Sequence, residues 1–235
     1  MEAVILAGGL GTRLSSRLND LPKSMASVGG RPFLAFLLDR LATAGCTRVI
    51  LSVGHLREAI IDTFQSNHHG MRLQYSIEDM PLGTGGAIRL ALSQTSEESV
   101  LVLNGDTFVN LDFRSITAHH DSSLRPMTMA VTRVEDTARY GGVVIENGQV
   151  AGFIEKGQAG PGWINAGVYV LNRQFPWPGD LPSRFSFETD LLGASADRIR
   201  PSAFIYHGYF LDIGIPEDLD RAQTELGDAT SDHCI

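Results

Sequence analysis

The chain has 235 residues, of which 43% are hydrophobic and 20% are charged, fractions typical of a folded globular protein rather than a disordered one. Its formal net charge of −8 argues against nucleic acid or an anionic membrane as the main partner, because both bind basic surfaces. No apolar run approaches the roughly 18 to 20 residues that cross a membrane, and the N-terminus lacks the basic start and cleavage site of a signal peptide, so we expect a cytoplasmic protein.

The first expected element is a short buried strand that ends in a glycine-rich turn. Residues 3–7 are apolar, residues 8–12 are rich in glycine, and cations follow at Arg13 and Lys23. Glycine leaves room for a ligand at the main chain, and successive amides of such a turn can face one anion. Arginine and lysine suit phosphate oxygens. An ordinary strand-to-helix loop would explain the glycines but not both cations, so this stretch predicts a polyphosphate site.

Two familiar phosphate-binding motifs do not fit this stretch. A P-loop requires Gly-x-x-x-x-Gly-Lys-Ser/Thr, and no lysine stands at that spacing after Gly8 or Gly9. The dinucleotide fingerprint requires a third glycine where this chain has Leu14. The turn therefore belongs to neither of these nucleotide-binding classes.

Alternating helices and strands follow. Pro32 suits the first turn of a helix, and a run of apolar residues without alternation, such as 48–53, is typical of a strand buried on both faces. This order indicates a doubly wound α/β sheet. The expected elements are a helix over residues 31–41 that stops at Gly45, a strand over 48–53, a helix over about 56–67 closed by Gly70, and a strand over 71–77.

A second glycine-rich turn, residues 78–88, opens a helix that we expect to continue to about Ser93. Its glycines would let a flat ligand such as a nucleobase approach the backbone, and the helix start offers free amide groups. A strand-to-helix loop without a ligand is the alternative.

The next expected strand covers residues 99–106 and ends on a carboxylate, Asp106. Ligands of open α/β sheets lie beyond the carboxyl ends of the strands. Asp106 is therefore a candidate to bind a metal or a ribose, and a cap for the following helix is the alternative.

The second half of the chain is richer in strands and should form a subdomain of the same sheet with antiparallel or mixed pairing. We expect strands over 127–134 and 165–171, and a hairpin of 141–145 with 149–155 around the Asn147-Gly148 turn. The remaining expected elements are a helix from Ser186 to Leu192 with Ser186 as a candidate cap, a strand over 204–212, a helix over 216–226 and a frayed tail over 227–235.

The cysteines and the paired histidines carry no expected site. Cys46 and Cys234 are too few for a disulfide framework, and we expect Cys46 to be a small buried apolar residue. The pairs His68-His69 and His119-His120 lie at expected helix ends. They lack metal-ligand spacing, and we expect them to face solvent.

The run from Leu6 to Leu14, followed by Pro22-Lys23, resembles the signature of the sugar-1-phosphate nucleotidyltransferases. Residues 83–87 match a Gly-Thr-x-Gly-Ala element of that family. The resemblance covers the whole chain and implies an α/β, Rossmann-like nucleotidyltransferase fold with a mixed, mostly parallel central sheet and a strand-rich sugar-side subdomain. It implies one domain over residues 1–226, in which 1–125 mainly bind nucleotide and 126–226 mainly bind sugar, and a tail over 227–235.

The same resemblance implies roles for individual residues. Without the resemblance, Glu155 and Lys156 would be interpreted as solvated charges. Glu188 or Asp190 could reach the sugar or merely interact with the helix dipole. A Mg²⁺ ion would be held by Asp106 and Asp212, although Ile215 stands where the family usually has threonine. The implied catalytic residues are Arg13, Lys23, Asp106 and Lys156; the nucleotide-binding residues are Leu6, Ala7, Gly8, Gly9, Gly11, Thr12, Arg13, Lys23, Gly83, Thr84, Gly86 and Asp106; and the sugar-binding residues are Tyr140, Gly141, Glu155, Lys156, Asn165 and Gly167.

These residues include no Ser-His-Asp or Cys-His arrangement and no paired general acid and base. A sugar 1-phosphate needs no base, because its second pKa is about 6 and it is already anionic near neutral pH. Catalysis can then depend on holding two anions in line and on neutralising their charge.

The run Glu78 to Ala87 and the short chain resemble the guanylyltransferases of the family that act on a heptose 1-phosphate of bacterial surface-polysaccharide synthesis. This resemblance implies GTP and a sugar 1-phosphate as substrates. Backbone contacts to a purine edge are compatible with several bases, so uridylyl or thymidylyl transfer to a hexose 1-phosphate stays open. A regulatory nucleotide-sugar sensor without turnover is the other alternative. The sequence gives no indication of the oligomeric state.

Overall fold

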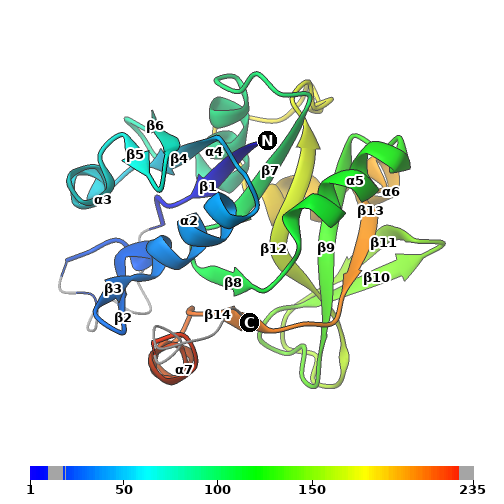
Figure 1. The fold of residues 1–235 in the computed structure, drawn as a ribbon. Coiled ribbons are helices and arrows are strands. Elements are labelled where there is room, and N and C mark those ends of the chain that lie inside the picture. The colour runs from blue at the N-terminus through cyan, green and yellow to red at the C-terminus, as the bar shows by residue number, and fades with distance from the viewer. Residues whose placement is uncertain (10–17, 19, 228–235) are drawn as a thin grey trace.

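The computed structural model describes residues 1–9, 18 and 20–227. Figure 1 shows an extended central sheet with helices on both sides. The strands are β1 (Glu2–Leu6), β2 (Ser27–Val28), β3 (Arg31–Pro32), β4 (Arg48–Val53), β5 (Asn67–His68), β6 (Met71–Ile77), β7 (Ser99–Asn104), β8 (Thr107–Val109), β9 (Met127–Val134), β10 (Gly142–Glu146), β11 (Gln149–Ile154), β12 (Gly162–Asn172), β13 (Ser202–Tyr206) and β14 (Phe210–Asp212). The helices are η2 (Lys23–Met25), α2 (Phe33–Thr43), α3 (Arg57–Phe64), α4 (Gly83–Leu92), α5 (Phe113–Ser123), η3 (Phe187–Gly193), α6 (Ala194–Ile199) and α7 (Pro216–Glu225).

Ten strands form the central sheet in the order β10-β11-β13-β9-β12-β7-β1-β4-β6-β5. β1 lies parallel between β4 and β7, and β6 continues this parallel part. β12 runs antiparallel to both β7 and β9, and β13 returns parallel to β9. Strands β5, β11 and β12 therefore run against the other strands. The expected α/β fold with a mixed, mostly parallel sheet is confirmed.

Two hydrophobic cores cover the two faces of the sheet. Because successive side chains of a strand point to opposite faces, Ala3 and Ile5 of β1 join one core while Val4 joins the other. The first core receives the apolar faces of α2, α5 and α7, and the second receives those of α4 and η3. The sheet is thus buried on both faces, as expected of parallel strands whose sequences lack alternation.

The helix expected over 31–41 begins at Phe33, because Arg31 and Pro32 form β3, and the strand expected over 99–106 ends at Asn104. Two further expected elements differ more from the structure. The expected strand over 204–212 is two strands in different sheets, since β13 ends at Tyr206 and β14 pairs with β8 in a separate two-stranded sheet. A Cβ atom at Gly208 would lie 2.3 Å from the Tyr206 hydroxyl oxygen, so glycine lets the chain turn against the Tyr206 ring, whose hydroxyl donates to the Tyr209 carbonyl. The helix expected over about 56–67 is shorter, because Gln65 ends α3 with a φ of +52° and Asn67 begins β5.

The expected helix from Ser186 is present as the π-helix η3, with the Ser186 hydroxyl accepting a hydrogen bond from the amide of Thr189. Its wider turn is seen where the Leu191 amide donates to the Ser186 carbonyl at 3.2 Å. π-helical turns are rare and often lie at functional sites. This one lies beside the cavity described below.

The prediction that the paired histidines face solvent is wrong for His68, whose side chain is 16% exposed, and for His120, which is 2% exposed. Its two ring nitrogens form hydrogen bonds with the Thr128 hydroxyl and with Asn172. His120 lies on the buried face of α5 with Phe113 and Ile116. These three residues have helical spacing, so the sequence already indicated that His120 shares the apolar face of the helix. Cys46 is buried as expected, whereas Cys234 lies outside the described residues. Among the described helices, none has the length and hydropathy of a membrane-crossing segment.

Candidate active site

A cavity of about 560 Å³ opens at the carboxyl ends of β1 and β7, the edge where ligands of open α/β sheets bind. Its wall combines segments from both halves of the chain. The lining residues are Leu6, Ala7, Gly8, Gly9, Lys23, Ser24, Glu78, Pro81, Gly83, Thr84, Asn104, Gly105, Asp106, Arg139, Tyr140, Lys156, Tyr169, Arg184, Phe187, Glu188, Asp212 and Gly214.

The first glycine turn begins against the end of β4. The Ala7 amide donates to the Ser52 carbonyl at 2.9 Å, and a Cβ atom at Gly8 would lie 3.1 Å from the Gly54 amide nitrogen. The predicted nucleotide-binding residues from 6 to 9 all line the cavity. Gly11, Thr12 and Arg13 lie outside the described residues, so their roles stay predictions.

The pairing of β8 with β14 brings the two predicted metal ligands to one place. Asp212 ends β14 opposite Thr107, the neighbour of Asp106, and the Ile213 amide donates to the Asp106 carbonyl at 3.0 Å. A Cβ atom at Gly105 would lie 2.4 Å from the Leu6 carbonyl, so only glycine lets the Asp106 segment pass this close to β1. Both carboxylates line the cavity.

Lys23 partly neutralises this acidic pair. Its Nζ lies 2.5 Å from Oδ2 of Asp106. Burial and the neighbouring charge of Asp106 raise the pKa of Asp212, although Lys23 and the amide of Gly214 act in the opposite direction. Two carboxylates that repel each other at one end of a sheet form a hard oxygen donor set of the kind that suits Mg²⁺. The residues therefore fit the ion that the sequence resemblance implies.

The glycines at the start of α4 have a structural role in addition to the predicted one. A Cβ atom at Gly83 would lie 2.5 Å from the Phe185 carbonyl, one at Gly85 would overlap the Phe185 ring, and one at Gly86 would lie 2.7 Å from the Ser183 carbonyl. The Gly85 amide, expected to be free, donates to the Phe185 carbonyl at 3.0 Å. These glycines make room for the segment 183–185 rather than for a ligand alone.

Of the predicted residues in this turn, Gly83 and Thr84 line the cavity, whereas Gly86 is buried behind its wall. The Thr84 hydroxyl accepts a hydrogen bond from the Phe187 amide at 2.8 Å. The turn is thereby fixed to the start of η3, so a nucleotide-side element and a sugar-side element of the predicted site share one wall.

The predicted sugar-side residues divide into two groups. Tyr140 and Lys156 line the cavity, whereas Gly141 and Glu155 lie beside it. Gly141 has a φ of +81°, and a Cβ atom there would lie 2.9 Å from the Ile154 carbonyl. It therefore allows the hairpin of β10 and β11 to close behind Lys156, which is a structural use of this glycine.

Asn165 and Gly167 act through other residues of the wall. Gly167 lies within a register shift of β12, with a φ of +71°, and a Cβ atom there would come 3.0 Å from Nδ2 of Asn104. Such irregularities often redirect side chains near active sites. Asn165 donates from Nδ2 to the Tyr169 hydroxyl at 2.5 Å and to Oε1 of Glu188 at 3.1 Å.

Glu188, which the sequence left undecided, reaches the cavity from η3. Its carboxylate is open to the cavity but ringed by protein atoms, and this poor solvation raises the pKa of Glu188 despite the opposing charge of Lys156. The Tyr169 hydroxyl also faces it, 3.4 Å from Oε1. Asp190, the other candidate, accepts a hydrogen bond from the Ser186 amide at 2.7 Å and so serves as a helix cap.

Sequence reasoning missed two cavity arginines, Arg139 and Arg184. Arg139 donates to the Asp212 carbonyl at 3.2 Å and to its Oδ1 at 3.3 Å, pairs with Asp218, and stacks its guanidinium 4.7 Å from the centre of the Tyr140 ring. It therefore orients the carboxylate of Asp212. In the sequence, the only indication of a role for Arg139 was its position directly before Tyr140-Gly141.

The fold and this cavity define an α/β enzyme scaffold whose site suits phosphate-bearing ligands. Residues 2–229 match the family model described as nucleotidyl transferase, and the chain belongs to that family.

Two relatives are similar over nearly their whole lengths. The chain is 42% identical over 226 residues to the D-glycero-alpha-D-manno-heptose 1-phosphate guanylyltransferase of Aneurinibacillus thermoaerophilus, covering 96% of this chain and 98% of that protein. It is 40% identical to the protein of the same name from Campylobacter jejuni, over 93% and 96% of the two chains. The crystal structure of HddC from Yersinia pseudotuberculosis superposes with a TM-score of 0.83 at 38% identity, over 96% of this chain and 99% of that one. A second structure of HddC holds GMP-PN and superposes with a TM-score of 0.82.

Proposed function

We propose that this protein transfers a guanylyl group from GTP to D-glycero-α-D-manno-heptose 1-phosphate and releases pyrophosphate. The observation that carries the proposal is that Gly8 and Gly9 of the first glycine turn, Lys23, the two aspartates and Lys156 line one cavity. A nucleotide at the turn and a sugar phosphate at Lys156 would meet beside Asp106 and Asp212. The two full-length relatives support this choice of base and sugar, and the HddC complex with GMP-PN supports a guanine nucleotide.

The proposed reaction is a direct displacement. A phosphate oxygen of the sugar 1-phosphate attacks the α-phosphorus of GTP, the bond from that phosphorus to the bridging oxygen breaks, and pyrophosphate leaves. Lys23 and Arg13 would neutralise the nucleotide phosphates and the leaving group, and Lys156 would orient the sugar phosphate. No side chain has to remove a proton, because the attacking phosphate is already anionic.

We propose that Asp106 and Asp212 hold Mg²⁺, and that Arg139 orients Asp212 for this purpose. The ion, when bound, would supply charge neutralisation between the two phosphate groups. On the sugar side, Glu188 would accept hydrogen bonds from sugar hydroxyls, held in place by Asn165 and Tyr169. Because the reaction consumes GTP, we place it in the cytoplasm.

A pyrophosphate-release assay tests the proposal. GTP, UTP, dTTP and ATP are each combined with the heptose 1-phosphate, mannose 1-phosphate and glucose 1-phosphate, and Asp106→Asn is the matched control. We expect GTP with the heptose 1-phosphate to give the highest kcat/KM, and the control to lose at least ~100-fold in kcat.

Faster turnover of UTP or dTTP with a hexose 1-phosphate would replace this proposal with the corresponding uridylyl- or thymidylyltransferase. Tight binding of a nucleotide sugar without turnover of any pair would identify a sensor instead.

A further inference from the structure

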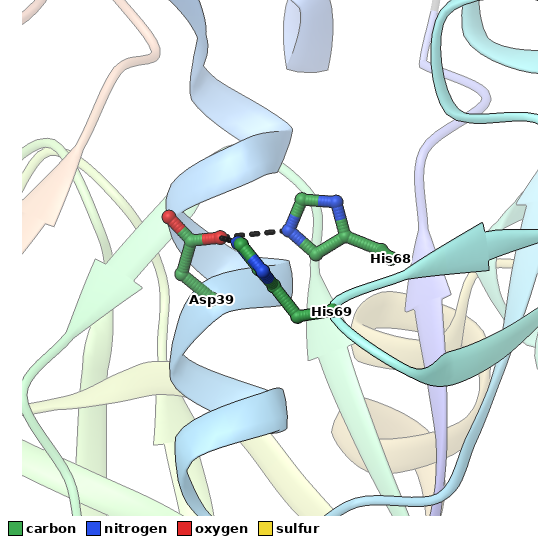
Figure 2. Close-up of side chains that lie close together, drawn as sticks. All are labelled: Asp39, His68 and His69. Atoms are coloured by element: carbon green, nitrogen blue, oxygen red, sulfur yellow. Dashed lines mark hydrogen bonds and ion pairs between the residues drawn. The ribbon is translucent and has the colours of Figure 1, made fainter.

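Three side chains that bind metals well lie together outside the cavity. Figure 2 shows Asp39 on α2 facing His68 of β5 and His69 of the following turn. Nε2 of His68 lies 2.7 Å from Oδ1 of Asp39, and Nε2 of His69 lies 3.3 Å from the same oxygen. One ligand atom from each residue lies within 4.8 Å of the others. None of the three lines the cavity of the candidate active site.

These distances are close to those of a tetrahedral metal site. Two ligand atoms that each lie about 2.0–2.1 Å from a zinc ion at the tetrahedral angle are about 3.3 Å apart. The separation of His69 from Asp39 already has this value. The separation of His68 from Asp39 is that of a hydrogen bond and needs to open by about half an ångström, which is within the freedom of a side-chain torsion.

The surroundings hold these ligands in place. Arg31 binds Oδ2 of Asp39 at 2.5 Å and leaves Oδ1 facing the two imidazoles, in the way that neighbouring hydrogen bonds orient metal-binding carboxylates. The His68 ring packs edge-on against Phe64, with the ring centres 5.8 Å apart, and its side chain is 16% exposed. His69 is 67% exposed, so an ion and a water molecule can reach the cluster from solvent.

A tight turn fixes the position of the His69 backbone. His69 and Gly70 have φ values of +48° and +80°, and they connect β5 to β6 as a two-residue hairpin turn. Such turns with two positive φ values favour Asn-Gly, because asparagine tolerates the left-handed conformation better than most residues. Histidine is also among the residues enriched in this conformation, so His69 suits the turn, and the turn fixes its backbone directly after His68.

We propose that Asp39, His68 and His69 bind a divalent transition-metal ion of the zinc class, with water completing the coordination. Imidazole nitrogens favour such ions over Mg²⁺. β5 is the last strand of the sheet and has β6 as its neighbour there. The ion would join α2 to the β5–β6 hairpin at this edge. Its role would be to stabilise this edge and not to take part in the reaction at the cavity.

Zinc titration by calorimetry in excess Mg²⁺ tests the proposal, because the Mg²⁺ occupies the proposed active-site carboxylates. The decisive variant is His69→Asn, which removes one ligand and suits the turn, and the matched control is His207→Asn at an exposed histidine outside the cluster. We expect the wild-type protein and the control to bind one zinc ion per chain and to show a zinc-dependent rise of several degrees in Tm. We expect His69→Asn to bind zinc at least ~10-fold more weakly and to lose that rise, while its metal-free Tm stays equal or becomes higher.

Cobalt(II) gives an independent readout, since its visible absorption becomes much stronger when the ion passes from octahedral coordination by water to a tetrahedral protein site. Absorption that appears in the wild-type protein and is lost in His69→Asn supports the site. Equal zinc affinity in the wild-type protein and His69→Asn, or no zinc binding by the wild-type protein, would overturn it. Nucleotidyl transfer measured in Mg²⁺ should be unchanged in His69→Asn, so failure of this inference and failure of the proposed function are distinguishable.

Discussion

At the scale of single residues, Glu188 shows how a group suited to binding is held at a cost to stability. Its carboxylate accepts hydrogen bonds from Asn165 and Tyr169, yet its surroundings solvate the charge poorly and raise its pKa above the ordinary value of 4.5. A group with a raised pKa binds protons more readily in the folded state. The free energy of unfolding that it contributes is therefore lost as the pH rises through the folded-state pKa.

Glu188→Gln keeps an oxygen acceptor at this position and removes the charge. We expect the KM for the sugar 1-phosphate to rise ~10-fold or more, because a charged hydrogen-bond acceptor is replaced by a neutral one, with little change in the KM for GTP. The free energy of unfolding of the variant, relative to the wild type, should increase as the pH rises above 4.5. Steady-state kinetics and urea unfolding at several pH values measure both effects, and an unchanged KM for the sugar 1-phosphate would remove Glu188 from the sugar site.

The residues of the site that the sequence predicted are those inside contiguous motifs. Lys23 and Asp106 stand in or directly after such motifs, and both line the cavity. Arg139 and Arg184 escaped prediction because their meaning depends on partners distant in the chain: Arg139 contacts Asp212, 73 residues away. The roles assigned to Arg13, Gly11 and Thr12 remain predictions.

At the scale of elements, Glu2 joins the start of β1 to two neighbouring segments. The Ser96 amide and hydroxyl donate to its carboxylate at 2.6 and 2.8 Å, the Glu97 amide donates at 3.1 Å, and Arg48 of β4 donates at 2.7 Å. Burial alone would raise the pKa of Glu2, but these hydrogen bonds outweigh it and lower the pKa to about 2. The contribution of Glu2 to stability is thus present above pH 4.5 and is lost as the pH falls toward 2.

Glu2→Gln should lower the free energy of unfolding by about 3 kcal/mol at pH 7, the value that corresponds to the difference between the two pKa values. The deficit relative to the wild type should shrink as the pH falls from 5 to 3. Denaturant unfolding across this range measures it, with Glu146→Gln at an exposed position as the control that stays near the wild type. A deficit that is constant from pH 7 to 3 would show that the charge of Glu2 does not stabilise the protein.

Several elements could be predicted from local pattern, and others could not. The strands over 48–53, 71–77 and 127–134 have the bounds that their residue patterns indicated. The division of 204–212 into β13 and β14 was not predictable from the same pattern, because the apolar character continues across Gly208 and only its close approach to Tyr206 marks the turn.

At the scale of the whole molecule, the site depends on pairings that no local pattern contains. β12 inserts between β7 and β9, and β14 leaves the main sheet to pair with β8. The first pairing brings Asn165 and Tyr169, which hydrogen-bond to Glu188, to the edge of the sheet where β1 and β7 end. The second brings Asp212 to the same edge. The family resemblance implied this fold, whereas composition and periodicity alone indicated only an α/β chain with a strand-rich second half.

The central claim is that this cavity holds two phosphate-bearing substrates in line and that one displaces pyrophosphate from the other directly, with no covalent enzyme intermediate. The stereochemical course at the α-phosphorus tests this claim most directly, with one diastereomer of guanosine 5′-O-(1-thiotriphosphate) as the donor and the heptose 1-phosphate as the acceptor. A single in-line displacement predicts inversion of configuration in the thio-substituted nucleotide sugar. Retention would require two successive displacements and would contradict the mechanism.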